Sequence, residues 1–380
     1  MLFSFPGFGS IHFFSLISVT LWTFLVGSIL QGVVGTLNGV KKGRILLAFL
    51  GILSVIFFLA VFKYPFLNNL FFRDGFFPRL KTPGPIFFIG ISYFSFKMMH
   101  FLVECYKRQI SKLSLIDYFN YILFFPAFIS GPINRYNHFC EQFNQQAKKS
   151  LKRDLINGGE RIIHGLFKKF ALVTLIYPYI LISLKKPAGQ LTAFEIAFGI
   201  YAYAFYFYFD FSGYSDMAIG SARLMGIELP ENFNNPFLKR NIQQLWANWH
   251  ISLTRWLSDY IYWPIVRKLR NIETFRKRHL LLSSISILIT FIVCGMWHGE
   301  TANFIIWGFY HGVGIACMNL YQSHKKKIKN KFLRRYFISK YSRTFGVIAT
   351  FHFFVFGLLF FVFDLENIKI LALRFLKFVF

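Results

Sequence analysis

One histidine in this sequence stands at the end of a long apolar run. His298 follows Phe291–Trp297, with Gly295 and Gly299 close by on either side. Glycine lacks side-chain bulk, so a substrate or a neighbouring helix can approach the imidazole closely. Removal of water favours the neutral ring, which is the form that accepts a proton. His298 is therefore a candidate general base for a hydroxyl nucleophile, although a hydrogen-bonded packing histidine between helices would give the same pattern.

A second concentration of polar and aromatic residues covers Leu245–Trp256. The segment contains His250 and three tryptophans, and it is too polar to face lipid. If it forms one helix, His250, Thr254 and Leu257 share a face. The pattern fits an interfacial helix with aromatic anchors, and it also fits a helix that lines a substrate site. His250 could orient substrate, bind a donor or simply pack.

Two acidic residues, Asp210 and Asp216, stand at the end of an apolar run rich in tyrosine and phenylalanine. Buried charge in a membrane is costly unless it is paired or wetted. Their spacing corresponds to about 240° around an ideal helix, so they share a face only if the helix breaks at Gly213. Pairing with Arg223 or with an arginine in a loop is the structural interpretation, and we favour it slightly over a functional one.

Several other catalytic classes lack their motifs. Gly213-Tyr-Ser-Asp-Met217 is not a G-x-S-x-G nucleophile elbow, because its last residue is methionine. There is no H-E-x-x-H, Walker or G-x-G-x-x-G motif. The four cysteines form no C-x-x-C pair, and His298 and His311 have no acidic or cysteine ligand at zinc-type spacing. We therefore expect no metal site.

The elements that hold these residues must be membrane helices. Hydrophobic residues make up 55% of the 380 positions and charged residues only 16%. A soluble chain of this length has too little interior for so much apolar surface. Each span needs about 20 apolar residues, and the candidates lie at roughly 13–36, 46–64, 86–104, 160–184, 191–211, 282–297, 303–321 and 345–364.

The basic residues predict orientation and argue against nucleic acid. The net charge is +27, but the lysines and arginines occur in short blocks between apolar runs. Under the positive-inside rule such blocks face the cytoplasm and meet anionic lipid. We therefore expect membrane lipids, and no nucleic acid, as partners.

The remaining segments complete the expected organisation. The first forty residues lack the basic region of a secretory signal and are interpreted as a first retained span. The stretch 117–132 is apolar but short and ends in Ser130-Gly-Pro132, which favours a re-entrant or broken helix. Because no repeat or long linker is present, we expect residues 1–380 to form a single membrane domain.

Four motifs, taken in order, resemble the bacterial membrane-bound O-acyltransferase (MBOAT) family. They are Tyr208–Gly220, Pro230–Pro236, Trp249–Leu253 and Trp297–Gly299, with Phe124–Pro126 and Ser130–Ile133 continuing the likeness toward the N-terminus. The resemblance implies an all-α integral membrane fold, with a ring of about 9–11 transmembrane and re-entrant helices around a central tunnel. An acyl thioester would enter from the cytoplasm and the acceptor hydroxyl from the opposite side.

The resemblance also assigns candidate roles. His298 matches the family's catalytic histidine, and His250 matches a second histidine near the tunnel. Further candidates, for substrate binding, are Asn248, Trp249, Trp297, Asp210, Asp216, Ser130 and Arg135. No tightly bound cofactor is implied, because the acyl group arrives as a thioester.

Two branches of the family fit the sequence. One transfers D-alanine from the phosphopantetheine of an acyl carrier protein to teichoic acid or a related envelope polymer. The other acetylates alginate or similar exported polysaccharides, with acetyl-CoA as a candidate donor. Ser130–Tyr136, Tyr310–Gly312 and Phe351–Gly357 are closer to the D-alanyl branch. Asn134 and Asn248 depart from it, because that branch usually shows Asp at the first position and often Arg at the second.

The implied setting is the bacterial cytoplasmic (inner) membrane, crossed several times. The implied partners are a carrier protein or other thioester donor, an envelope glycan or glycolipid acceptor, and accessory envelope-modification proteins. A non-enzymatic transporter or polymer-export component could use the same polar helices. Transporters often show internal repeats, and none is found here.

Overall fold

The computed structural model describes residues 10–32, 41–73, 90–144, 151–184, 186–328, 330, 337 and 339–379. These residues are mainly helical, and an isolated antiparallel β-bridge pairs Phe233 with Trp249. The α-helices are α1 (Ser10–Gly32), α2 (Lys41–Lys63), α3 (Pro65–Asn68), α4 (Ile91–Lys107), α5 (Leu115–Leu123), α6 (Tyr136–Asn144), α7 (Leu151–Leu166), α8 (Val173–Leu184), α9 (Ala193–Leu224), α10 (Ile242–Asn248), α11 (Ile251–Leu257), α12 (Trp263–Leu269), α13 (Glu273–Lys277), α14 (His279–His298), α15 (Ala302–Lys327), α17 (Lys340–Gly357), α18 (Leu359–Val362) and α19 (Leu365–Val379). Shorter 3-10 or π segments are η3 (Asn69–Arg73), η5 (Phe125–Ala127), η7 (Phe167–Leu172), η8 (Ala188–Gln190), η9 (Pro236–Leu238) and η10 (Ser258–Tyr262).

Five helical segments in the described ranges are long and apolar enough to cross a bilayer. Lipid offers no hydrogen bonds, so a spanning segment must satisfy its backbone internally, as a helix does. The five are Phe14–Gly32, Lys42–Lys63, His279–His298, Ala302–Lys327 and Lys340–Val362. They correspond to five of the eight predicted spans, and the prediction of an all-helical membrane fold is confirmed.

The other predicted spans differ in detail. Helix α4 covers the described part of 86–104, and 160–184 is a helix interrupted by the π segment η7. Helix α9 has 32 residues and runs through both acidic positions without a break at Gly213. In the stretch 117–132, α5 ends at Leu123 and the 3-10 turn η5 follows, so the predicted break is present.

The chain separates into two compact units by its internal contacts. The first unit contains the residues up to Ile163 together with Ser215–Pro230, and the second contains His164–Tyr214 and the residues from Glu231 onward. The prediction of a single domain over 1–380 is not tested by this division and stays a prediction. Each unit is described separately below.

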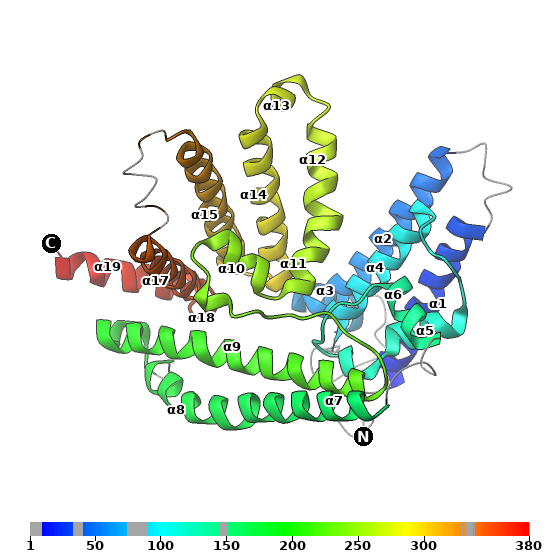
Figure 1. Ribbon diagram of the computed structural model, residues 1–380, viewed down its shortest axis with the longest axis horizontal. Coiled ribbons are helices and arrows are strands. Elements are labelled where there is room, and N and C mark those ends of the chain that lie inside the picture. Colours follow the sequence, from blue (N-terminus) through cyan, green and yellow to red (C-terminus); the bar gives the residue numbers. More distant parts are fainter. Residues whose placement is uncertain are drawn as a thin grey trace. The chain divides into compact units, whose positions relative to one another are not determined.

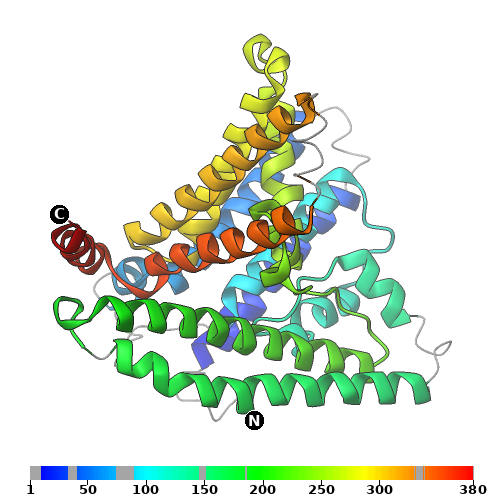
Figure 2. The same ribbon diagram turned by 60° about the vertical axis from the view of Figure 1, so that its left-hand side comes forward.

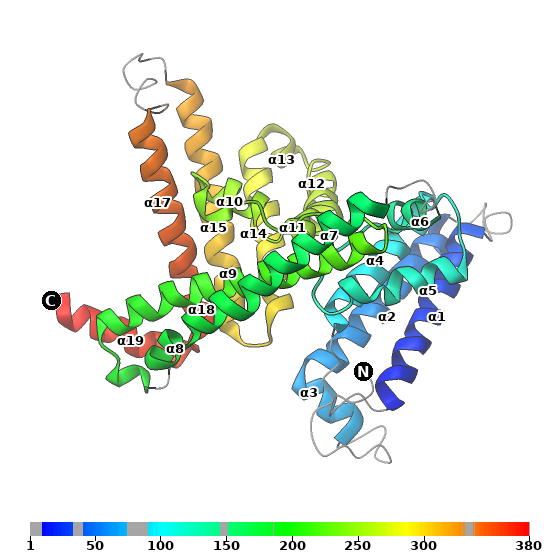
Figure 3. The ribbon, with the colours of Figure 1, turned by 60° about the horizontal axis from the view of Figure 1, so that its bottom comes forward.

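In the first unit, helices α1, α2 and α4 pack side by side (Figure 3). Their interior is aromatic, with the rings of Phe101 and Tyr118 4.2 Å apart. The Tyr118 hydroxyl forms a 2.7 Å hydrogen bond with Thr23 Oγ1. A buried hydroxyl without such a partner would destabilise the bundle.

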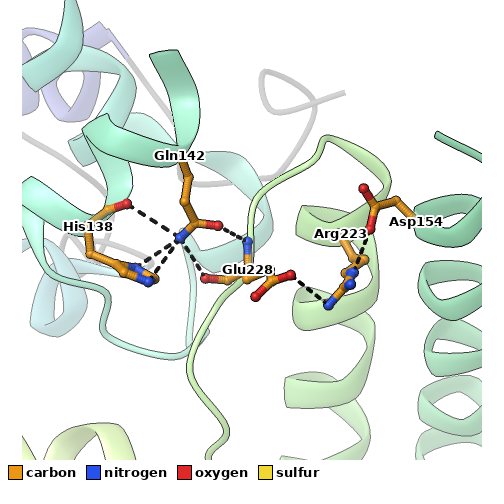
Figure 4. A network of polar contacts seen from close by, with 5 residues as sticks. All are labelled: His138, Gln142, Asp154, Arg223 and Glu228. Carbon is orange, nitrogen blue, oxygen red and sulfur yellow. Dashed lines mark hydrogen bonds and ion pairs between the residues drawn. The ribbon is translucent and has the colours of Figure 1, made fainter. Parts of the chain in front are cut away.

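A polar network in the first unit ties the end of α9 to α6 and α7 (Figure 4). Arg223 forms ion pairs with Asp154 at 2.8 Å and with Glu228 at 3.1 Å. The Gln142 amide accepts from the backbone N–H of Glu228 at 2.7 Å and donates to its carbonyl at 3.2 Å. Arg223 is thus committed to Asp154 and Glu228, and the predicted pairing of Arg223 with Asp210 or Asp216 is wrong.

In the second unit, α14 and α15 form a hairpin (Figure 1). Glycines allow the two backbones to touch: a Cβ atom on Gly295 would lie 2.2 Å from the carbonyl oxygen of Phe304, and one on Gly308 would lie 2.2 Å from that of Phe291. The segment η7–α8 and the N-terminal part of α9, up to Tyr214, also lie side by side (Figure 2), and the ring centroids of Tyr177 and Tyr206 are 6.0 Å apart.

The contact at Gly308 predicts that a single methyl group will destabilise the hairpin. Gly308→Ala is expected to lower the free energy of unfolding by about 1–3 kcal/mol, because the added Cβ atom meets backbone that cannot move aside. Gly159→Ala in α7 is the matched control, since a Cβ atom there meets nothing within 4 Å. Thermal unfolding midpoints of the two variants in detergent check this, and equal midpoints would contradict it.

Candidate active site

A cavity of about 210 Å³ in the second unit brings the two predicted histidines together. His298 reaches it from the end of α14, and His250 reaches it from the junction of α10 and α11. The walls are mainly aromatic and aliphatic. Their aromatic residues are Phe207, Phe211, Trp246, Trp249, Tyr262, Phe291, Trp307, Phe354 and Phe361.

His298 is surrounded by aromatic rings. The rings of Trp307 and Phe361 each lie 5.0 Å from the imidazole in edge-to-face contacts, and the ring of Trp297 lies 4.6 Å away. Trp307 belongs to α15, which the glycine contacts hold against α14. The predicted close approach of a neighbouring helix beside His298 is present, and the helix is α15. Its Phe304 fills the space beside Gly295 and Gly299.

The predicted single helix over Leu245–Trp256 is wrong. Figure 1 shows α10 and α11 as two separate helices. Helix α10 ends at Asn248, Trp249 is extended, and His250 adopts a left-handed backbone with φ of 42° before α11 begins. Left-handed backbone costs a non-glycine residue about 1–2 kcal/mol, and such residues cluster at functional sites. The break turns the side chains of both Trp249 and His250 into the cavity.

The segment that follows Pro230 holds this break in place. The backbone of Asn234 donates to the carbonyl of Asn248 at 3.1 Å, and Ile251 donates to the carbonyl of Asn232 at 2.9 Å. The Asn232 side chain is fully buried, and its Oδ1 accepts from Ser252 Oγ at 2.6 Å. Asn232 is a residue that the sequence analysis assigned no role, and the asparagine-rich run between Pro230 and Pro236 was the available signal.

Burial makes His250 neutral. Its ring is in contact with Phe211, at 4.6 Å between centroids, and loss of hydration lowers its pKa to about 3. An imidazole with this pKa is uncharged at neutral pH, so it can accept one hydrogen bond and donate another. The predicted face of His250, Thr254 and Leu257 does line the cavity, because His250 caps α11 and its carbonyl accepts from Thr254 N.

The π segment η10 adds hydroxyl groups to the cavity wall. Ser258 and Tyr262 both line it, and the Tyr262 hydroxyl lies 3.2 Å from Ser283 Oγ on α14. Ser283 also accepts a hydrogen bond from Asn319 of α15. Single π turns in α-helices occur frequently at functional sites. These hydroxyls were not predicted from the sequence.

The other predicted residues of the second unit have distinct positions. Trp249 lines the cavity and packs on Phe354, with ring centroids 4.8 Å apart. Asn248 and Trp297 are not among its lining residues, although Trp297 contacts the His298 ring and Asn248 Nδ2 donates to the carbonyl of Gln244. Asp210 forms an ion pair with Lys169 of η7.

Three predicted residues belong to the first unit. Asp216 accepts a 2.6 Å hydrogen bond from Arg161 Nε, so both acidic residues are ion-paired as the structural interpretation expected, but with partners other than Arg223. Arg135 lies 3.3 Å from His100 Nδ1, and Ser130 follows the turn η5. Roles of these residues in binding substrate stay predictions.

The described residues offer little to a metal ion. Within them, no group of three or more histidine, cysteine, aspartate or glutamate side chains is arranged to hold one. The cavity instead combines two imidazoles with hydroxyls and aromatic walls. Such a site suits general-base chemistry on a hydroxyl group in a place from which much water is excluded.

Comparison with known proteins agrees with this chemistry. The family described as MBOAT, membrane-bound O-acyltransferase, matches residues 87–360. Teichoic acid D-alanyltransferase of Bacillus subtilis is 33% identical over 75% of this chain and 73% of that protein. The protein of the same name from Streptococcus thermophilus is 30% identical over 71% and 67%. A probable alginate O-acetylase of Pseudomonas syringae pv. tomato is 31% identical over 79% of this chain and 56% of its own length.

The contacts of Asn232 predict its importance for the site. Asn232→Ala removes the acceptor of Ser252 and is expected to lower the free energy of unfolding by about 1–3 kcal/mol. Asn234→Ala is the matched control, because Asn234 is exposed and contributes its backbone N–H, which alanine keeps. Thermal unfolding in detergent measures both, and an Asn234→Ala loss as large as that of Asn232→Ala would contradict the assignment.

The lowered pKa of His250 predicts a pH-dependent stability. Between about pH 3 and pH 6.5 the unfolded state binds a proton at this position and the folded state does not, so stability falls as the pH falls through this range. His250→Asn, which tolerates left-handed backbone, is expected to show a smaller loss. Unfolding midpoints at pH 4 to 8 test it against His324→Asn, an exposed histidine. Equal pH slopes in all three proteins would refute it.

Proposed function

This chain belongs to the membrane-bound O-acyltransferase family, and from that premise we propose that it transfers an acyl group from a thioester to a hydroxyl of an extracytoplasmic envelope polymer. The favoured acyl group is D-alanyl, carried on the phosphopantetheine of a carrier protein, and the favoured location is the bacterial cytoplasmic membrane. The observation that carries the proposal is the aromatic cavity shared by His298 and His250.

In the proposed reaction His298 acts as the base. Its neutral ring takes the proton of the acceptor hydroxyl while the oxygen attacks the thioester carbonyl carbon. The carbon–sulfur bond then breaks, and the departing thiolate takes the proton back from the imidazolium. Proton transfer of this kind contributes on the order of 10²–10⁴ in rate, so positioning by the cavity must supply much of the rest. No covalent acyl-enzyme is required.

His250 serves the same reaction as a neutral hydrogen-bonding group. Its lowered pKa and its fixed backbone suit a side chain that orients a substrate carbonyl or hydroxyl without adding charge. Trp249 beside it supplies a flat apolar wall. His250 is therefore proposed to position substrate, and His298 to move the proton.

The relatives and the cavity lining favour different acyl groups for the donor. The two D-alanyltransferases among the relatives favour D-alanyl. None of the nineteen described residues lining the cavity is acidic, so the ammonium group of D-alanine would find aromatic faces rather than a carboxylate. This lining favours an uncharged acetyl group as the second candidate, as in the alginate O-acetylases.

The carrier protein and the acceptor are the proposed partners. Helices α12 and α13 and the turn between them expose a basic surface that suits an acidic carrier or acidic donor, with Arg267, Lys268, Arg270 and Arg276 in exposed positions. Their topological role at a cytoplasmic face would explain the same charges. A transporter or export component, the alternative from another class, would not depend on a proton-accepting residue at position 298.

Ester release from isolated envelopes tests the proposal. Cells lacking the protein, and cells producing His298→Ala, are expected to lose one alkali-labile ester, and measurement of released D-alanine and acetate names the donor branch. His324→Ala, an exposed histidine at the end of α15, should behave as wild type. Full ester content with a stably inserted His298→Ala protein would refute the catalytic role, and loss of neither ester on deletion would count against envelope acylation.

A further inference from the structure

A second hollow lies against the α14–α15 hairpin and shares no lining residue with the cavity described above. This groove has a volume of about 690 Å³ and is lined by residues of α14, of α15 and of the segment before α14. Its long walls are apolar, and the end of the groove at the start of α14 is basic; this end is called the rim below. The lining residues are Lys277, Arg278, His279, Leu280, Leu281, Ser284, Ile285, Leu288, Val313, Ala316, Cys317 and Leu320.

The groove is separate from the active-site cavity. On α14 the cavity is lined by positions 287, 290, 291, 294 and 298, whereas the groove is lined by 279, 280, 281, 284, 285 and 288. Beyond the first turn of α14, each set follows the three- and four-residue spacing of one helix face, and the two faces point in different directions. No lining residue is common to the two hollows.

The length of the groove matches one leaflet of a bilayer. From Arg278 to Leu288 the helix rises by about 15 Å, which is half of the roughly 30 Å of a hydrocarbon core. Helix α14 itself has 20 residues and is long enough to cross the whole core. The groove begins where α14 begins and ends halfway along it, so its length along the helix matches that of one lipid acyl chain.

The charge of the rim selects the headgroup. Lys277, Arg278 and His279 are exposed, and none of the twelve lining residues in the described chain is acidic. Lys277 also pairs with Glu273 at 2.8 Å, but both side chains are 72% exposed, and such surface pairs contribute little. A basic rim above an apolar channel complements a phosphate group with an attached hydrocarbon chain.

We propose that this groove binds an anionic phospholipid of the membrane leaflet that faces Lys277 and Arg278. The phosphate contacts the basic rim, and one acyl chain lies between α14 and α15 along Leu281, Leu288 and Val313. Under the positive-inside rule this leaflet is the cytoplasmic one. The site depends on the membrane character of the chain and not on the acyl transfer proposed above.

Cys317 provides a direct measurement, because it is an exposed cysteine in the groove wall, whereas Cys105, Cys140 and Cys294 are buried. Cys317 lies within the candidate span Ala302–Lys327, so the protein is kept in detergent, where no bilayer shields the thiol. It is mixed with phosphatidylcholine or with phosphatidylglycerol, and alkylation of Cys317 by N-ethylmaleimide is followed by mass spectrometry. Phosphatidylglycerol is expected to slow the alkylation roughly fivefold or more. Lys277→Ala/Arg278→Ala should remove this protection.

Lys326→Ala/Lys327→Ala is the matched control, because it removes two exposed charges at the same end of the hairpin but outside the groove. Protection that persists in this control supports the proposal. Equal protection by phosphatidylcholine alone, or protection that survives in Lys277→Ala/Arg278→Ala, would overturn it. Equal protection of detergent-solubilised protein by glycerol phosphate would also overturn it, because the ligand would then be a free phosphate.

Discussion

The site depends on a satisfied break in the backbone. In an apolar interior every backbone N–H or C=O group without a hydrogen-bond partner destabilises the fold. A chain can therefore leave the helical conformation only where other groups take over its hydrogen bonds. The segment 232–234 does this for the junction of α10 and α11, with backbone bonds on both sides of Trp249 and with the Asn232 amide on Ser252. These bonds hold the break at which Trp249 and His250 both face the cavity.

The α14–α15 hairpin lines part of the cavity with one face and the groove with another. Close contact at Gly295 and Gly308 brings Trp307 against His298. The same contact leaves a groove on a different face, where the basic start of α14 stands above apolar walls. The proposed catalytic imidazole and the proposed lipid groove therefore use separate sets of side chains on one helix pair.

The lining of the cavity disfavours charged groups. Aromatic walls and burial keep His250 neutral, which fits substrate positioning, and they give no carboxylate to a charged donor. The two acidic residues of α9 are ion-paired within their own units, Asp210 with Lys169 and Asp216 with Arg161. Relatives named as D-alanyltransferases and relatives named as probable O-acetylases have similar identities to this chain, so identity alone does not select the donor.

The sequence alone determined the helical membrane character and the family, because hydrophobic length and short motifs are local properties of the chain. It also singled out His298 and His250, which the structure brings into one cavity and whose roles stay predictions. It also indicated that the acids of α9 would be ion-paired. It could not determine the partners of those acids, the break at His250 or the role of Asn232, because each depends on residues that are brought together only by folding. Arg161 and Asp216 are far apart in the sequence, and a regular pattern over Leu245–Trp256 concealed the break. Tertiary structure decided these points, since hydrogen bonds from a distant segment can outweigh a local preference for helix.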